Sequence, residues 1–307
     1  MLCRGRIAAK IYEKRNERMY HMIINPKAGD KKVRRMLNTI KRCFEEAGEE
    51  YQIHETTRAG EGKEIAVELT KEEGVKLIAV GGDGSVHDVL NGIRDVEKCD
   101  FGIIPLGTGN DFVVSAGIPY DIKKAVEIIL HGECKPTDYL EVNGIRCMNV
   151  AGIGIDVDVL ERCNQGKGRG KLKYLKSLIV SLFKFHGYDT TVECEGETFQ
   201  IKTLIGAACN GRLFGGGIEI CPVAKLDDGK LDVMVVECFK SKWSIIKAFM
   251  MLMSGKIMKY KPKRYFKADC VKIVPEKPCT MQLDGELYYN QSVFEAKVCK
   301  GLRLYRP

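Results

Sequence analysis

Apolar residues in the first half of the chain follow two kinds of spacing. Short continuous apolar runs predict buried strands over residues 22–24, 77–80 and 101–104. After each run and a turn, apolar residues recur three or four positions apart, the spacing of an amphipathic helix. The helical positions are Val33, Leu37, Ile40 and Phe44, then Val86, Val89, Leu90 and Ile93, and finally a helix near residues 121–130. Strand, turn and helix repeated in this order predict a parallel sheet covered by helices.

The pattern changes at about Thr137, where short alternating segments begin. They predict antiparallel strands over residues 191–194, 199–208, 231–236, 271–274 and 292–298, interrupted by helices over 171–185 and 242–253. We therefore predict an α/β + β fold in three parts: a basic N-terminal extension (1–19), a Rossmann-like α/β domain (20–137) and an antiparallel β-sandwich domain (138–307). The C-terminal strand is a candidate for return to the first domain.

Composition narrows the class of protein. With 307 residues, 45% hydrophobic and 29% charged, the chain has the content of an ordinary globular protein with room for two domains. It holds no run of eighteen apolar residues, and its N-terminus lacks the apolar core of a secretory signal. We expect a cytoplasmic protein that is not integral to a membrane.

Cysteines and charge add two expectations. The 13 cysteines stand singly with no C-x-x-C pair, which favours reduced thiols over disulfides or a zinc finger. The formal charge of +8 is concentrated in basic clusters near residues 4–18, 167–176 and 256–267. Such clusters attract the phosphates of nucleic acid or of anionic lipids, or form an ordinary solvated surface.

Three glycine-rich turns each follow a predicted strand of the first domain. They cover residues 25–29, 81–85 and 106–111. Ligands gather at the carboxyl ends of parallel strands, and glycines let backbone N–H groups approach phosphate oxygens. One such turn alone is usually a plain tight turn, whereas three at one sheet edge indicate a phosphate site. No Walker sequence and no G-x-G-x-x-G is present.

The motifs carry a specific resemblance. Gly81-Gly82-Asp83-Gly84-Ser85 resembles the GGDGT signature shared by diacylglycerol, sphingosine, ceramide and NAD kinases. Five further motifs occur in the order found in bacterial soluble diacylglycerol kinases: Asn-Pro-x-x-Gly at 25–29, Gly-Thr-x-Asn-Asp at 107–111, Phe-Gly-Gly-Gly at 214–217, Asp-Asp-Gly-Lys-Leu-Asp at 227–232 and Leu-Asp-Gly-Glu at 283–286. The resemblance runs from about residue 20 to the C-terminus.

The resemblance implies that the first domain binds ATP, the phosphate donor. The implied nucleotide-binding residues are Asn25, Pro26, Lys27, Ala28, Gly29, Thr56, Gly81, Gly82, Asp83, Gly84, Ser85, Val86, His87 and Thr108. Ser85 replaces the usual Thr and keeps its hydroxyl. His87 and Asp88 replace the Asn and Glu of the pattern, which puts a nucleotide contact there in doubt, and we expect His87 on the helix surface.

The resemblance also implies catalytic carboxylates. Either Asp284 or Glu286 would be the general base, and Asp83, Asp111 and Asp138 would form the network around Mg²⁺; for Asp138 a plain strand-entry turn is the alternative. A second, structural magnesium would be held by the Asp228 carboxylate with backbone carbonyls near Lys225 and Lys230. There the alternative is a simple β-turn.

Together these expectations describe an ATP- and Mg²⁺-dependent lipid kinase whose second domain takes the lipid substrate. The implied reaction converts diacylglycerol to phosphatidic acid at the bilayer surface, with the enzyme associated peripherally. A sphingoid lipid, phosphatidylglycerol or NAD as acceptor stays open, as do a non-catalytic nucleotide or lipid sensor and a homodimer. A nucleic-acid partner is not expected, because the chain lacks an aromatic-rich or zinc signature.

The predicted helix over 171–185 bears on how the lipid is reached. Leu172, Leu175, Ile179 and Leu182 form an apolar stripe flanked by Lys173, Lys176 and Lys184. This pattern is typical of an interfacial helix and also of a helix packed on a sheet, and we favour the packed helix.

Overall fold

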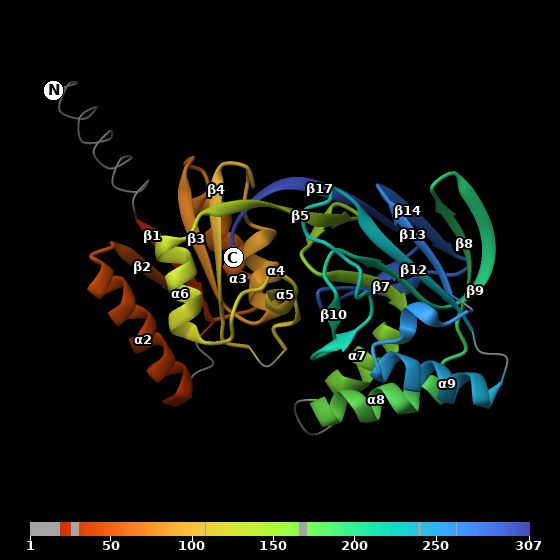
Figure 1. The fold of residues 1–307 in the computed structure, drawn as a ribbon. Coiled ribbons are helices and arrows are strands. Elements are labelled where there is room, and N and C mark those ends of the chain that lie inside the picture. Colours follow the sequence, from red (N-terminus) through yellow and green to blue (C-terminus); the bar gives the residue numbers. More distant parts are fainter. Residues whose placement is uncertain (1–18, 26–30, 108, 166–170, 239–240, 262) are drawn as a thin grey trace. The chain divides into compact units, whose positions relative to one another are not determined.

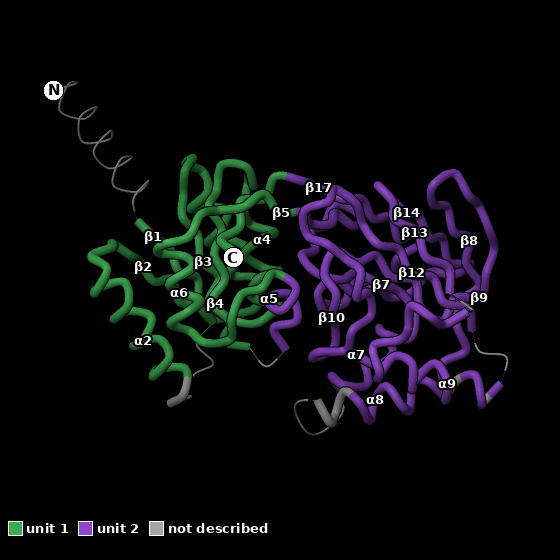
Figure 2. The backbone as a smooth tube through the Cα atoms, viewed as in Figure 1, with its two compact units in different colours: residues 1–107, 116–137, 301–307 green, residues 108–115, 138–300 purple. Residues whose placement is uncertain are grey.

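The computed structural model describes residues 19–25, 31–107, 109–165, 171–238, 241–261 and 263–307. Pro26, Lys27, Ala28, Gly29, Thr108 and the basic extension up to residue 18 lie outside these ranges. The chain divides into two compact units (Figure 2). The first takes the described residues up to Gly107 with 116–137 and 301–307, and the second takes 109–115 and 138–300.

The first unit is a parallel sheet with helices on both faces (Figure 1). Its strands are β1 (Tyr20–Ile24), β2 (Tyr51–Glu55), β3 (Val75–Gly81) and β4 (Cys99–Pro105), and its helices are α2 (Lys31–Ala47), α3 (Glu61–Leu69), α4 (Asp83–Leu90) and α6 (Ile122–His131). The strand order is β2-β1-β3-β4, and every pair is parallel. This alternation of strand and helix confirms the predicted parallel sheet covered by helices, whereas β2 and α3 were not predicted.

Burial explains which face each helix presents. Ile40 and Phe44 of α2 are fully buried against the sheet, and Val126 and Ile129 of α6 join the same core. Their three- and four-residue spacing places them on one side of each helix. Helix α6 begins where predicted, because the Asp121 side chain accepts a hydrogen bond from the N–H of Lys124 at 3.0 Å and caps the helix.

The second unit is built from antiparallel strands. They are β6 (Ile145–Cys147), β7 (Val150–Gly154), β8 (Tyr188–Cys194), β9 (Glu197–Cys209), β10 (Leu213–Phe214), β11 (Ile218–Glu219), β12 (Leu231–Glu237), β13 (Lys263–Ala268), β14 (Cys270–Pro275), β15 (Cys279–Leu283) and β16 (Glu286–Gln291). The central order is β16-β15-β7-β9-β8-β14, and β12 joins β9 to β13. The predicted fold class is confirmed.

Two strands belong to both units. β5 (Cys134–Val142) pairs with β6 in the second unit, and β17 (Phe294–Tyr305) pairs there with β14. The last residues of β17 lie in the first unit, where Arg303 and Leu304 pair in parallel with Asp100 and Phe101 of β4.

Helices α7 (Ile155–Gln165), α8 (Lys171–Lys184) and α9 (Lys242–Met253) cover one core of the second unit, to which a 3₁₀ turn (Ile257–Lys259) also contributes. The short helix α5 (Asp111–Ser115) contacts β10. The two predicted helices are confirmed as α8 and α9, and α7 was not predicted. The predicted stripe of α8 is partly wrong: Leu182 is buried, but its buried neighbours are Ser177, Leu178 and Ser181, and Ile179 is exposed.

Two sequence expectations concern the whole chain. Every cysteine in the described residues is a free thiol. None of the helices that the structure describes is long and apolar enough to pass through a bilayer.

Candidate active site

Strand register in the first unit brings the predicted nucleotide residues to one sheet edge. Ile24, the last residue of β1, lies opposite Glu55 of β2 and Val80 of β3, and Gly81 lies opposite Pro105. All four strands therefore end at the same edge, and the segments that follow them begin there. This edge is where an open parallel sheet binds ligands.

The turn over residues 81–85 joins β3 directly to α4. Helix α4 begins at Asp83, and the N–H of Val86 closes its first turn on the Gly82 carbonyl at 3.1 Å. Ser85 packs so closely on Gly81 that a side-chain carbon added at Gly81 would lie 2.6 Å from the Ser85 Cβ, and closer still to its Oγ. The turn needs glycine at position 81, and it presents the N-terminal end of α4 at the sheet edge, as phosphate binding requires.

We expect Gly81→Ala to lower stability by about 1–3 kcal/mol, because the added methyl overpacks the turn. The same displacement of Ser85 is expected to raise KM for ATP. Gly62→Ala is the matched control, since its added carbon would have no neighbour nearer than 3.5 Å. Thermal unfolding and ATP kinetics of both variants check this, and wild-type values for Gly81→Ala would contradict it.

Thr56 and the start of α4 are fixed by buried contacts. The Thr56 N–H and hydroxyl both donate to the Ile24 carbonyl, at 2.8 and 3.3 Å, and this joins the turn after β2 to the end of β1. His87 is 3% exposed, so the expectation of a surface position was wrong: α4 lies between β3 and α3 and buries it. Asp88 accepts a hydrogen bond from the Gly60 N–H at 3.2 Å, which connects α4 to the beginning of α3.

In the second unit, Asp284 lies at the turn between β15 and β16 with φ of 54°. Its carboxylate accepts hydrogen bonds from two consecutive backbone N–H groups, those of Met148 and Asn149, both at 2.8 Å. The Cys147 thiol donates to Oδ1 at 3.1 Å. Burial, and then the nearby Asp284, raise the pKa of this thiol well above its ordinary value, so it stays a donor. Three donors, at the end of β6 and in the two residues that join it to β7, therefore fix the Asp284 carboxylate.

The backbone of this turn is held as well. The Asp284 N–H donates to the Val150 carbonyl at 3.1 Å, and the Gly285 N–H donates to Oε1 of Gln282 at 3.0 Å. Glu286, the other candidate base, is exposed at the start of β16. Of the two carboxylates, Asp284 is the one that its surroundings orient.

Two asparagines that sequence reasoning missed fix the backbone that donates to Asp284. Asn210, which is 0% exposed, donates through Nδ2 to the carbonyls of Asp138 and Met148 at 2.8 and 2.7 Å. Asn149 donates through Nδ2 to the Leu213 carbonyl at 2.8 Å and accepts the backbone N–H of Asn210. The signal that was available is position, since Asn210 lies two residues after the strand predicted over 199–208 and directly after β9.

Asp111 begins α5 and is buried. Its Oδ2 accepts a hydrogen bond from the Gly216 N–H at 2.7 Å. Gly215, Gly216 and Gly217 have φ of 61°, 85° and 105°, a conformation that side chains other than hydrogen rarely tolerate. The triple glycine thus forms the β10–β11 turn and brings a backbone donor to Asp111.

Asp138, a residue of β5, also accepts a backbone hydrogen bond from a glycine turn. Its Oδ2 accepts the Gly229 N–H at 2.6 Å, and its own N–H donates to the Leu226 carbonyl at 2.6 Å. Burial raises the pKa of Asp138, and the Gly229 hydrogen bond opposes this. These bonds attach the 226–229 loop to the strand, which is the structural role given above as the alternative. A catalytic role for Asp138 stays a prediction.

At the predicted second magnesium site, the Asp228 carboxylate already pairs with a lysine. Asp228 accepts the Lys230 N–H at 3.2 Å through Oδ1, in the manner of an Asx turn. Its Oδ2 forms an ion pair with the Lys267 ammonium, without hydrogen-bond geometry. A magnesium ion ligated by Asp228 and the carbonyls of Lys225 and Lys230 would have to displace that ammonium. The second magnesium site stays a prediction.

The donors predicted for the catalytic Mg²⁺ have suitable chemistry. Asp83 lies in the first unit, and Asp111 and Asp138 lie in the second. All three offer carboxylate oxygens, which a hard cation prefers. Among the residues that the structure describes, no group of three or more Asp, Glu, His or Cys could hold a metal ion without further ligands. One or two carboxylates suffice for Mg²⁺ that also binds nucleotide phosphates.

A buried carboxyl lies beneath the Asp284 turn. Asp156 of α7 is 3% exposed, and its Oδ2 accepts a hydrogen bond from Gln282 Nε2 at 3.1 Å. It borders a small cavity of about 50 Å³ whose other lining side chains are apolar, among them Leu178, Leu204 and Phe249. Burial raises the pKa of Asp156 to about 6, against the hydrogen bonds that lower it.

This shift makes stability depend on pH. Because the pKa is higher in the folded protein than in the unfolded chain, the contribution of Asp156 is fully present below pH 4 and is lost as the pH rises to 6. We expect Asp156→Asn to be more stable than the wild type by up to about 3 kcal/mol at pH 8, and by only about 1 kcal/mol at pH 4.5. Urea unfolding at both pH values measures this. Asp158→Asn, which removes the Arg162 ion pair, is the control; an equal gain at both pH values for Asp156→Asn would contradict the prediction.

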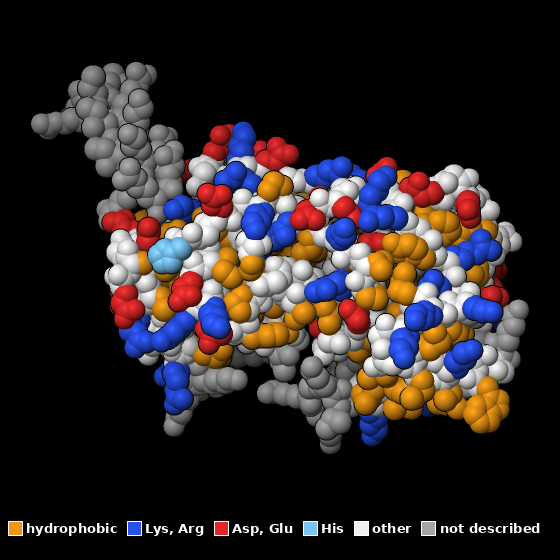
Figure 3. Space-filling view, viewed as in Figure 1, with side chains coloured by type: hydrophobic (Ala, Val, Ile, Leu, Met, Phe, Trp, Pro, Cys, Tyr) orange, Lys and Arg blue, Asp and Glu red, His pale blue; other side chains and the backbone are white. Residues whose placement is uncertain are grey.

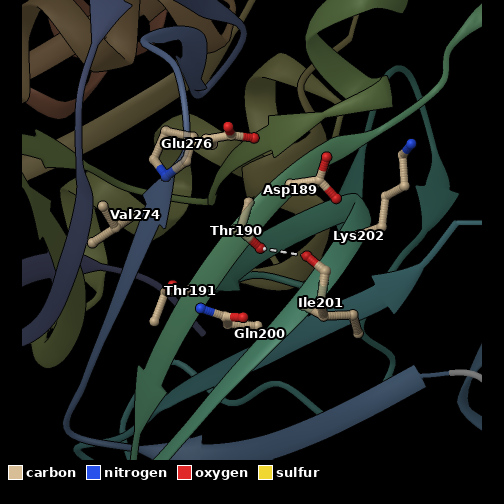
Figure 4. Close-up of a pocket in the computed structure, with 9 residues that line it drawn as sticks. Asp189, Thr190, Thr191, Gln200, Ile201, Lys202, Val274 and Glu276 are labelled. Carbon is tan, nitrogen blue, oxygen red and sulfur yellow. Dashed lines mark hydrogen bonds between the residues drawn. The ribbon is translucent and has the colours of Figure 1, made fainter.

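An open hollow of about 620 Å³ lies elsewhere in the second unit, on β8, β9 and β14 (Figure 4). Asp189, Lys202 and Glu276 line it, and Thr190 donates across its floor to the Ile201 carbonyl at 3.1 Å. None of the predicted site residues lines this hollow.

Comparison with known proteins agrees with both halves of this arrangement. Residues 19–142 match the family described as diacylglycerol kinase catalytic domain, and residues 149–304 match the YegS C-terminal NAD kinase beta sandwich-like domain. A diacylglycerol kinase of Bacillus subtilis is 30% identical over 272 residues, which cover 86% of this chain and 88% of the relative. The chain belongs to the diacylglycerol kinase family.

Other members extend the comparison. A diacylglycerol kinase of Staphylococcus carnosus is 30% identical over 275 residues, with 86% of this chain and 87% of the relative covered. A crystal structure of a diacylglycerol kinase from Bacillus anthracis superposes with a TM-score of 0.77 at 25% identity, and covers 95% of this chain and 97% of that one. This member of the diacylglycerol kinase family is therefore a kinase.

Within each unit the family's motif residues are brought together. In the first, Asn25, Thr56 and residues 81–87 follow strands that end at one edge. In the second, hydrogen bonds connect Asp284 through Asn149 and Asn210 to Asp138. Pro26, Lys27, Ala28, Gly29 and Thr108 lie outside the described residues, and their nucleotide contacts stay predictions.

Proposed function

We propose that this kinase transfers the γ-phosphate of ATP to the free hydroxyl of diacylglycerol, in the presence of Mg²⁺, and forms phosphatidic acid. The observation that carries the proposal is the Asp284 carboxylate, held by two backbone N–H groups and a thiol at a β-turn. Family membership supports a lipid acceptor, because relatives across 86% of the chain are named diacylglycerol kinases.

Asp284 would act as the general base. The lipid hydroxyl oxygen attacks the γ-phosphorus, its proton passes to the Asp284 carboxylate, and the bond from the γ-phosphorus to the bridging oxygen breaks to release ADP. The Met148 N–H donates to Oδ2, and the Asn149 N–H and the Cys147 thiol donate to Oδ1. Because both oxygens are already oriented, the base needs no reorganisation when the substrate arrives.

The first unit would hold the nucleotide. The N-terminal end of α4, opened by the Gly81–Ser85 turn, offers backbone N–H groups to phosphate oxygens. Asp83, Asp111 and Asp138 would hold Mg²⁺, which when bound neutralises the charge of the triphosphate.

The test is transfer of labelled γ-phosphate from ATP and Mg²⁺ into separate dispersions of diacylglycerol, ceramide, sphingosine and phosphatidylglycerol, with NAD as a soluble acceptor. Label in phosphatidic acid supports the proposal. Label in another lipid moves the acceptor within the lipid class, and label in NAD alone would replace the lipid by a soluble substrate. Absence of label from every acceptor would favour a non-catalytic sensor.

A further inference from the structure

Helix α9 exposes an apolar face that the fold does not cover. Trp243, Ile246, Met250 and Met253 are all exposed, and Trp243 is 80% exposed. Their spacing of three, four and three residues places them along one side of the helix. A large exposed aromatic side chain in line with two methionines is unusual on the surface of a globular domain.

The opposite side of α9 is already used by the fold. Ala248, Phe249 and Leu252 pack into the core beneath α7 and α8. The helix is therefore apolar on both sides, although burial of one side is enough to attach it to the sheet. Folding of the second unit therefore does not explain why the exposed side of α9 is apolar.

Helix α8 contributes to the same surface. Leu178 and Leu182 are buried, while Ile179 and Phe183 are exposed, and α8 contacts α9. Figure 3 shows hydrophobic side chains gathered over the region of α8 and α9, with Lys and Arg side chains around them. We call this surface the α8–α9 face: Ile179, Phe183, Trp243, Ile246, Met250 and Met253.

The charged side chains that α8 and α9 themselves carry have one sign. Lys176, Lys184 and Lys247 are exposed on the two helices. No Asp or Glu occurs in either helix, or anywhere between residues 162–188 and 238–268. An apolar surface on two helices whose charged side chains are all lysines is complementary to a bilayer that contains anionic phospholipid, into which apolar side chains insert while lysines meet head groups. The neighbouring acidic residues lie on other elements, Glu219 on β11 and Glu161 on α7.

We propose that the α8–α9 face docks this kinase on the surface of an anionic bilayer. The choice of a bilayer over a protein partner rests on the proposed function, since diacylglycerol resides in a membrane, and on the lysines of α8 and α9, which carry no acidic residue. Trp243 would enter the interfacial layer, where indole side chains are favoured, and Lys176, Lys184 and Lys247 would contact lipid phosphates.

Trp243 is itself the reporter, because the chain contains 1 Trp. The full-length kinase is titrated with vesicles of phosphatidylcholine alone and of phosphatidylcholine with phosphatidylglycerol, without diacylglycerol. We expect a blue shift of Trp243 emission, and quenching by brominated lipid, with the anionic vesicles. Unchanged Trp243 emission on vesicles that carry the protein down in sedimentation would overturn the proposal, because another surface would then bind.

Two variants of the α8–α9 face test the proposal and leave Trp243 in place. Ile246→Ser with Met250→Ser is expected to weaken sedimentation with anionic vesicles by about tenfold or more. Replacement of Lys176, Lys184 and Lys247 by glutamine is expected to weaken it by about 100-fold and to remove its salt dependence. Tyr120→Ser, which removes an exposed aromatic side chain of the first unit, is the control and should bind as the wild type does. Wild-type binding by both face variants would overturn the proposal.

Activity separates this inference from the proposed function. With a short-chain diacylglycerol below its critical micelle concentration, the face variants should turn over as fast as the wild type. Equal loss on this soluble substrate and on vesicles would overturn the docking role. Docking by Trp243 in a protein that phosphorylates no lipid would remove the proposed function and leave the docking face. Concentration-dependent dimerisation that shifts Trp243 without lipid would assign the face to a second copy and overturn the proposal.

Discussion

Asp284→Asn is expected to lower turnover by about 10² to 10⁴-fold, the contribution of a positioned general base. The amide oxygen cannot take the lipid proton as a carboxylate does. The amide nitrogen would also face one of the two N–H groups, of Met148 or Asn149, that now donate to the carboxylate. KM for ATP should change little, because the predicted nucleotide residues with described positions lie in the other unit.

Glu286→Gln is the matched control for this experiment. Its side chain is exposed two residues away, so the variant should keep most of the wild-type turnover. Steady-state kinetics with diacylglycerol, together with thermal unfolding of both variants, separate a lost base from a lost fold. A turnover of Asp284→Asn close to the wild-type value, or a larger loss in Glu286→Gln, would remove Asp284 from the role.

Asn210→Ala is expected to destabilise the second unit by about 2–5 kcal/mol. The substitution leaves the buried carbonyls of Asp138 and Met148 without their donor, at about 1–3 kcal/mol for each. Met148 also donates to Asp284, so turnover should fall in the protein that remains folded. Urea unfolding, and activity measured well below the midpoint, give the two effects.

Asn164→Ala, on the exposed side of α7, controls for the loss of an asparagine side chain and should leave stability unchanged. Asn210→Asp is informative as well, because it keeps size but replaces the donor Nδ2 by an acceptor. It should be no more stable than Asn210→Ala. Recovery of stability in the aspartate variant would show that packing, not hydrogen bonding, is what position 210 supplies.

The elements of the first unit could be predicted because their signals are local. A buried strand, a glycine turn and an amphipathic helix occupy consecutive residues, as in β3, residues 81–85 and α4. His87 shows what prediction from local sequence signals cannot give. Helical spacing gives one buried side, whereas α4 packs between β3 and α3 and buries residues on more than one side.

The support of the candidate site could not be predicted, because it depends on distant pairs. Asn210 meets Asp138 and Met148 from 72 and 62 positions away, and the donors of Asp284 lie 135 to 137 positions away. Nothing near Asn210 distinguishes it from any other asparagine at the end of a strand. Motifs identified Asp284, but only the antiparallel pairing of β15 with β7 shows what holds it.

The return of β17 makes the first unit dependent on the end of the chain. Leu302 and Leu304 are fully buried, and Tyr305 joins the core beneath α2 and α6. On the ribosome, β4 therefore emerges about two hundred residues before the strand that covers its edge, and stays open to other strands meanwhile. Closure of that sheet joins residues far apart in the sequence and should therefore be slow, and removal of residues 301–307 should prevent it.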